Sequence, residues 1–83
     1  MSEADAQRVY AETLSWAAGL RAGMAFSTSI LCILVNRGII SSDDAAVAVL
    51  TARQQVEKQT SLTEPQRAVA LASFDEAEAE VRR

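Results

Sequence analysis

Residues 36–44, Asn-Arg-Gly-Ile-Ile-Ser-Ser-Asp-Asp, interrupt the apolar pattern of this 83-residue chain and decide where its helices begin and end. Gly38 is suited to the left-handed conformation that ends many helices. Ser41 or Ser42 is a typical N-cap, and the two aspartates that follow lie in the positively polarised first turn of the next helix. The stretch therefore predicts a sharp turn between two helices.

Similar signals divide the rest of the chain. Ser2 is the candidate N-cap of a first helix that ends near Arg37, and the second helix is expected to run to about Gln59. The third is expected to begin after Thr60–Thr63 and to end near Val81; Ser61-x-x-Glu64 and Thr63-x-x-Gln66 both fit a capping box, and Pro65 suits a first turn. We therefore expect one all-α domain over residues 1–83, a long first helix followed by a helical hairpin.

Composition limits how so short a chain can be stabilised. A domain of 83 residues hides only about 60–65% of the surface of its unfolded chain, which leaves little stability to spare. Cys32 is the only cysteine and there is no histidine, so neither an internal disulfide nor a zinc site is expected. We expect no metal or other cofactor, and oligomerisation is the remaining source of stability.

Charge argues against nucleic acid as a partner. The net charge is −3, and the basic residues are scattered rather than clustered: Arg8, Arg21, Arg37, Arg53, Lys58, Arg67, Arg82 and Arg83. The acidic N-terminal residues lack the basic region of a secretory signal, and a lone cysteine is typical of a reducing compartment. These features predict a cytoplasmic protein.

The sequence contains no recognisable catalytic set. Histidine, the commonest general base, is absent, and Lys58 is the only lysine. No phosphate-binding glycine loop is present. Cys32 lies between Leu31 and Ile33, late in its helix, where a structural thiol is expected. We therefore predict that the protein is not an enzyme.

Helical periodicity indicates which faces are buried. One face of the first helix is shared by Tyr10, Leu14, Ala17, Met24, Leu31 and Val35. In the second half of that helix the opposite face is apolar too, with Phe26, Ile30 and Ile33. Three helices cannot surround the longest of them, so this apolar surface predicts a second copy of the chain and a homodimer.

Small residues recur at every fourth position of the first helix: Ala11, Ser15, Gly19, Gly23 and Ser27. Each glycine costs the helix about 1 kcal/mol relative to alanine. Three explanations are open: close approach in a symmetric interface, crowding against the chain's own helices, or a break near Gly19–Gly23 that would give four short helices. Uninterrupted, the first helix would measure about 52 Å and the other two about 26 Å.

The apolar and small residues of the first helix predict an interface on that helix. Trp16 is included because it lies off the Leu14 face and because tryptophan is common at assembly contacts, with packing in the core as the equal alternative for this side chain. The predicted interface residues are Ser15, Trp16, Gly19, Gly23, Phe26, Ile30 and Ile33.

One segment approaches the length of a membrane span. Residues 17–35 form a largely apolar run of about 19 residues, where about 20 are needed. The run includes Arg21, two glycines and the polar residues 27–29, so a buried helix is the preferred interpretation. Arg21 is expected to extend to water or to pair with a carboxylate, for which Glu78 is the candidate.

These observations favour a non-catalytic interaction, adaptor or regulatory protein that acts as a homodimer. A peripheral membrane or lipid-binding protein, using the apolar end around Phe26, is one alternative. A small acidic inhibitor of the antitoxin type, directed at a basic partner, is another. The partner itself is not indicated by any motif in the sequence.

Overall fold

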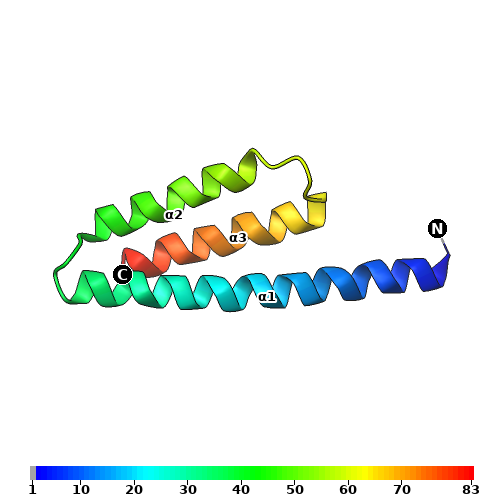
Figure 1. Cartoon of the computed structure of the whole chain (residues 1–83), viewed down its shortest axis with the longest axis horizontal. Coiled ribbons are helices and arrows are strands. Elements are labelled where there is room, and N and C mark those ends of the chain that lie inside the picture. Colours follow the sequence, from blue (N-terminus) through cyan, green and yellow to red (C-terminus); the bar gives the residue numbers. More distant parts are fainter. Residues whose placement is uncertain (1) are drawn as a thin grey trace.

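The computed structural model describes residues 2–83, which form three helices and no strand. The helices are α1 (Glu3–Asn36), α2 (Ser42–Glu57) and α3 (Glu64–Val81) (Figure 1). The predicted all-α fold with a long first helix is confirmed. The alternative with four short helices is wrong, because α1 continues without a break through both glycines.

Side-chain caps set the beginning of each helix. Ser2 caps α1 as predicted. Ser41 caps α2 in a reciprocal box, in which its hydroxyl accepts from the N–H of Asp44 (3.0 Å) and the Asp44 carboxylate accepts from the N–H of Ser41 (3.4 Å). Of the two boxes that the sequence offers for α3, the structure uses Thr63 with Gln66 (3.2 and 3.0 Å). Satisfied backbone donors explain why all three helices start where local sequence indicates.

The turn between α1 and α2 depends on Gly38. Its φ of +71° lies in the left-handed region, which most residues avoid. The N–H of Gly38 donates to the carbonyl of Val35 (3.0 Å), and the N–H of Ile39 donates to that of Leu34 (2.9 Å). These two bonds form a Schellman motif, which satisfies carbonyls at the end of α1 and reverses the chain.

The hairpin of α2 and α3 covers only part of α1. α3 packs against both other helices, and the N-terminal turns of α1 project beyond the hairpin (Figure 1). At 1.5 Å per residue, α1 is about 51 Å long, whereas α2 and α3 are about 24 and 27 Å long. Tyr10 and Leu14, expected in the core, are exposed because they lie beyond the reach of the hairpin, although they share a side of α1 with Ala17.

The core consists mainly of small side chains. Its buried cluster comprises Ala45, Ala46 and Val49 of α2 and Phe74, Ala77 and Val81 of α3, bordered by Met24, Leu31, Cys32 and Val35 of α1. Alanine allows α2 and α3 to approach closely, but it contributes little apolar area. Along α2, Ala46 is buried and Ala52 is exposed.

Arginines connect α2 to α3. The Arg53 guanidinium contacts Asp75 (3.1 Å), and Arg82 contacts Asp43 (3.1 Å). Hydrogen bonds to Glu78, and then to Asp43, raise the pKa of Arg82 above its ordinary value. Because the carboxylates of both interhelical pairs are solvent-exposed, each pair adds only modestly to stability.

Arg67 has a more specific role at the other end of the hairpin. Its guanidinium donates to the backbone carbonyls of Val56 (3.3 Å), Glu57 (3.0 Å) and Gln59. The Val56 and Glu57 carbonyls lie at the C-terminal end of α2, which carries partial negative charge, and that of Gln59 follows it in the turn. The Val56 carbonyl also accepts from the N–H of Gln59 (3.1 Å). A single planar side chain of α3 therefore terminates α2 and holds the second turn.

Replacing Arg67 should loosen that turn. We expect Arg67→Ala to lower the free energy of unfolding by about 1.5–3 kcal/mol, since it removes charge-assisted hydrogen bonds to carbonyls. Urea denaturation followed by circular dichroism measures the change. Arg8→Ala is the matched control, because the Arg8–Asp5 pair is largely exposed and should contribute less than about 1 kcal/mol. Equal urea midpoints for Arg67→Ala and wild type would contradict this role.

Candidate interaction surface

The molecule exposes more surface than a compact protein of its size. Its accessible surface is 5819 Å², whereas a globular monomer of 8.9 kDa is expected to expose about 4,800 Å². Its radius of gyration is 15.2 Å, compared with about 12 Å for a compact domain of this length. The surplus of about 1,000 Å² is comparable to the roughly 800 Å² that each partner buries in a standard protein–protein interface.

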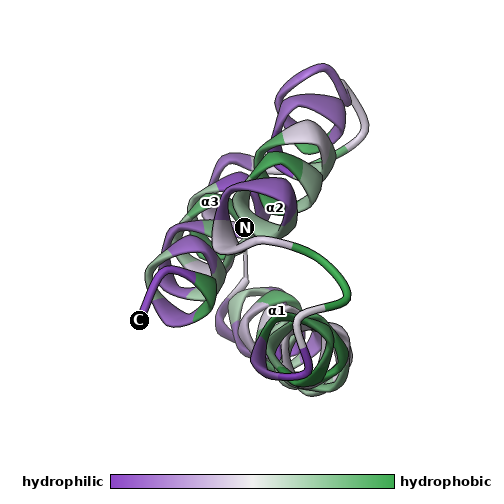
Figure 2. Ribbon diagram, turned by 90° about the vertical axis from the view of Figure 1, so that its left-hand side faces the viewer, coloured by the Kyte–Doolittle hydropathy of each residue, from purple (hydrophilic) through white to green (hydrophobic). Residues whose placement is uncertain are grey.

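Among the described residues, three exposed large apolar side chains lie on the side of α1 turned away from the hairpin, whereas others, such as Tyr10 and Val47, lie elsewhere. Viewed along the molecule, α1 has helical neighbours on one side only, and its apolar colouring continues around to the free side (Figure 2). Phe26 is 70% exposed, Ile33 53% and Ile30 44%. We call this side the outer face of α1 and define it by Trp16, Gly19, Gly23, Phe26, Ile30 and Ile33.

All seven predicted interface residues lie on or beside the outer face. Ser15 borders it and is exposed, and Trp16 is half-buried at its N-terminal end. The core side chains Ala17, Met24 and Leu31 lie on the opposite side of the helix, as a 100° rotation per residue requires. The structure brings the predicted set together on one surface, although it contains no second molecule to contact it.

The two helical glycines meet nothing within the chain. A Cβ atom added at Gly19 or Gly23 would have no heavy atom within 4 Å. Crowding against the chain's own helices is therefore wrong as an explanation for them, and so is a break in α1. Close approach of another molecule is the one of the three explanations that stays open.

Two charged residues extend the outer face at its ends. Glu12 precedes Trp16 by four residues, and Arg37 follows Ile33 by four. Both side chains are exposed, and neither forms an ion pair within residues 2–83. The sequence reasoning did not assign them to the interface; the alternation of three- and four-residue steps is the signal that identifies them.

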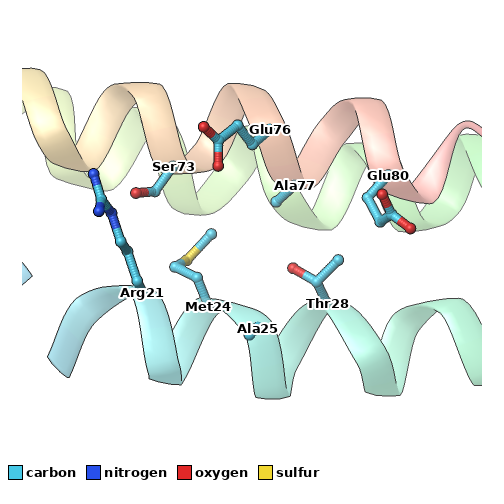
Figure 3. A pocket seen from close by; sticks show the side chains of 8 residues that line it. All are labelled: Arg21, Met24, Ala25, Thr28, Ser73, Glu76, Ala77 and Glu80. Atoms are coloured by element: carbon cyan, nitrogen blue, oxygen red, sulfur yellow. The ribbon is translucent and has the colours of Figure 1, made fainter. Parts of the chain in front are cut away.

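An open groove between α1 and α3 is a weaker candidate for a ligand site. Its volume is about 280 Å³, and Arg21 of α1 points toward α3 near Ser73, with Glu76 and Glu80 further along the groove (Figure 3). The Ser73 hydroxyl already donates to the carbonyl of Val69 (2.9 Å). Within residues 2–83, no buried side-chain polar atom lacks a hydrogen-bond partner.

Of the two outcomes expected for Arg21, the structure agrees with the first, because the residue is exposed. The alternative, a pair with Glu78, is wrong. Glu78 accepts from Arg82 (3.2 Å), which lies four residues later on the same helix. Two residues four apart on a helix face each other at little entropic cost, so this local partner is favoured over one on another helix. Among residues 2–83, no group of three histidine, cysteine, aspartate or glutamate side chains is arranged to hold a metal ion.

α1 also has the length and composition of a membrane-spanning helix. It is the one such helix within residues 2–83, and only 6% of its most apolar 18-residue window is buried in the structure. The preferred expectation of a buried helix is therefore wrong for the chain taken alone, because the hairpin covers one side of α1.

Comparison of this chain with protein-family models, with curated proteins and with solved structures finds no match. The class that the fold defines is a small all-α protein of three helices, with an uncovered apolar helix face. That face is therefore the feature of the molecule that bears on its function.

The empty space around the glycines predicts an unusual response to substitution. At a dilution where the chain is monomeric, Gly19→Ala combined with Gly23→Ala should raise the free energy of unfolding by about 2 kcal/mol, because alanine favours the helix by about 1 kcal/mol per site. Thermal denaturation followed by circular dichroism measures the shift.

Gly38→Ala is the matched control for that experiment. It should be destabilising by about 1–2 kcal/mol, since Gly38 has a φ of +71° and alanine disfavours the left-handed region. A loss of monomer stability in the Gly19/Gly23 double variant would show that these positions are packed inside the chain.

Proposed function

We propose that this protein is a non-catalytic interaction protein that acts as a homodimer, using the outer face of α1 to bind a second copy. The observation that carries the proposal is the exposure of Phe26, Ile30 and Ile33 on one uninterrupted helix, opposite the side that the hairpin covers. Contiguous apolar surface of this kind marks an interaction site in soluble proteins.

Energetics support self-association over an exposed monomer. Burying one large apolar side chain contributes about 1.5–3 kcal/mol, and a symmetric dimer buries each outer-face residue twice. The internal core consists largely of alanine and valine. Larger apolar side chains, Phe26, Ile30 and Ile33, are exposed on α1 instead. Association therefore adds apolar burial that the chain cannot obtain by folding alone.

Dimerisation through α1 would leave the two hairpins on the outside of the assembly. Each copy would then present the free surfaces of α2 and α3, with exposed charged residues such as Asp43, Lys58 and Asp75. An arrangement of two identical polar surfaces around a helical centre suits an adaptor or regulatory role, in which a dimer binds two copies of a target or one symmetric target.

A peripheral membrane or lipid-binding role is the second candidate. It is favoured by the length and apolarity of α1 and by the small buried share of its most apolar window. The same outer face would then contact acyl chains instead of another copy. Against full insertion, the apolar window is interrupted by Arg21, and charged side chains are costly within a bilayer.

Sedimentation equilibrium tests the proposal directly. We expect wild type to be a dimer at micromolar concentration, and Phe26→Ser combined with Ile30→Ser to raise the dissociation constant at least about 100-fold, because both copies lose two buried side chains. Trp16 is the only tryptophan and lies on the outer face, so its emission should shift to the red on dilution of wild type.

The matched control removes one aromatic and one β-branched side chain elsewhere. Tyr10→Ser combined with Val47→Ser changes two exposed residues that lie off the outer face, and it should leave the dissociation constant unchanged. A wild-type chain that stays monomeric in buffer and sediments with phosphatidylcholine vesicles would reject the dimer in favour of the membrane alternative. A monomer that binds only a basic protein would instead favour the acidic inhibitor.

A further inference from the structure

The outer face has a regular spacing that extends beyond its apolar residues. From Glu12 to Arg37 its positions follow steps of four and three residues in strict alternation: 12, 16, 19, 23, 26, 30, 33 and 37. This is the heptad spacing at which two helices coil around each other in a left-handed sense. The spaced residues cover about 38 Å of α1, more than half of its length.

Side-chain size changes along the central part of this spacing. Between residues 19 and 33 the small residues, Gly19 and Gly23, come first, and the large residues, Phe26, Ile30 and Ile33, follow. Trp16, the largest side chain of the series, lies N-terminal to both glycines. Parallel pairing would place glycine opposite glycine and Phe26 opposite Phe26, which leaves a gap beside a crowded layer. Close packing disfavours both.

Antiparallel pairing resolves the mismatch. A two-fold axis between Met24 and Ala25 places Gly23 opposite Phe26 and Gly19 opposite Ile30. Each large side chain then meets the space above a glycine, where the structure shows no atom within 4 Å of a Cβ position. Trp16 and Ile33 pair in the next layer under the same axis.

The charged residues at the two ends of the series favour the same antiparallel arrangement. The same two-fold axis places Glu12 of one copy opposite Arg37 of the other, at both ends of the contact. In the parallel arrangement each of these side chains would face its own equivalent, with like charges together. Both residues are exposed and unpaired within residues 2–83, so they are available for this contact.

The flanking positions also permit close approach. Ala22, Ser27 and Ser29 border the central layers, and all three are small and exposed. Small residues on both sides of a helix–helix seam let the two backbones approach and let a large side chain from the other helix reach the glycine.

We propose that two copies of this chain pair through α1 as an antiparallel coiled coil centred between Met24 and Ala25, with Gly19 and Gly23 of each copy accepting Ile30 and Phe26 of the other. The inference rests on the proposed dimer, and it adds the direction, the register and the role of the two glycines. Glu12 and Arg37 set the direction by pairing across the interface.

Disulfide trapping tests the arrangement. In a Cys32→Ala background, Glu12→Cys and Arg37→Cys proteins are prepared separately, mixed, and equilibrated in a glutathione redox buffer. The mixed 12–37 disulfide should exceed either homodisulfide on the order of 100-fold, because the dimer holds only the mixed pair at high effective concentration. Gln55→Cys, on the far side of the molecule in α2, is the matched control and should form only background disulfide.

Each alternative outcome has a distinct meaning. Trapping of 12–12 and 37–37 disulfides would overturn the antiparallel direction and leave the dimer in place. A dimer by sedimentation that traps none of these pairs would overturn the register and the use of the outer face. A monomer at all concentrations would reject the proposed function itself. If Cys32→Ala reduces the helix content, Cys32→Val serves as a second background.

Discussion

A helix of 34 residues cannot be covered by neighbours of 16 and 18 residues, and the main features of this protein follow from that mismatch. The hairpin of α2 and α3 packs on one side of α1 and ends well short of its N-terminus. On the covered side of α1, Met24, Leu31 and Val35 are partly buried against the core. On the other side, Phe26, Ile30 and Ile33 stay exposed. Because α1 is longer than the hairpin and is covered on one side only, the molecule has excess accessible surface, and that surface lies on α1.

The small side chains of the core increase the energetic importance of these exposed apolar residues. Alanine lets α2 and α3 approach closely but offers little area to the hydrophobic effect, so the second turn also depends on Arg67 and its backbone carbonyls. A chain of this size has a small stability margin. In such a molecule, burial of the large side chains outside the core, above all Phe26, would add hydrophobic stabilisation that the folded monomer lacks.

Local signals in the sequence were sufficient to predict the helices, because caps such as Ser41 and Thr63 act within four residues. Contacts between residues that are far apart in the sequence could not be predicted from these local signals. Tyr10 lies on the correct side of α1, but periodicity does not state how far the hairpin reaches. Arg67 was missed because its partners are backbone carbonyls, which carry no side-chain pattern. The candidate interface was found because an all-round apolar segment is visible in sequence, whereas its charged ends needed the heptad spacing.

The projecting N-terminal turns of α1 have a further consequence for dynamics. Residues 2–12 are all exposed, so the helix there is held by local contacts alone: its own hydrogen bonds, its Ser2 cap and the Arg8–Asp5 pair. Isolated helices of about ten residues are marginal in water. The amide protons of these turns should therefore exchange by local fraying, independently of the hairpin. These turns lie beyond both the hairpin and the proposed contact from Glu12 to Arg37, so their exchange reports on α1 alone, while exchange in the hairpin reports on folding.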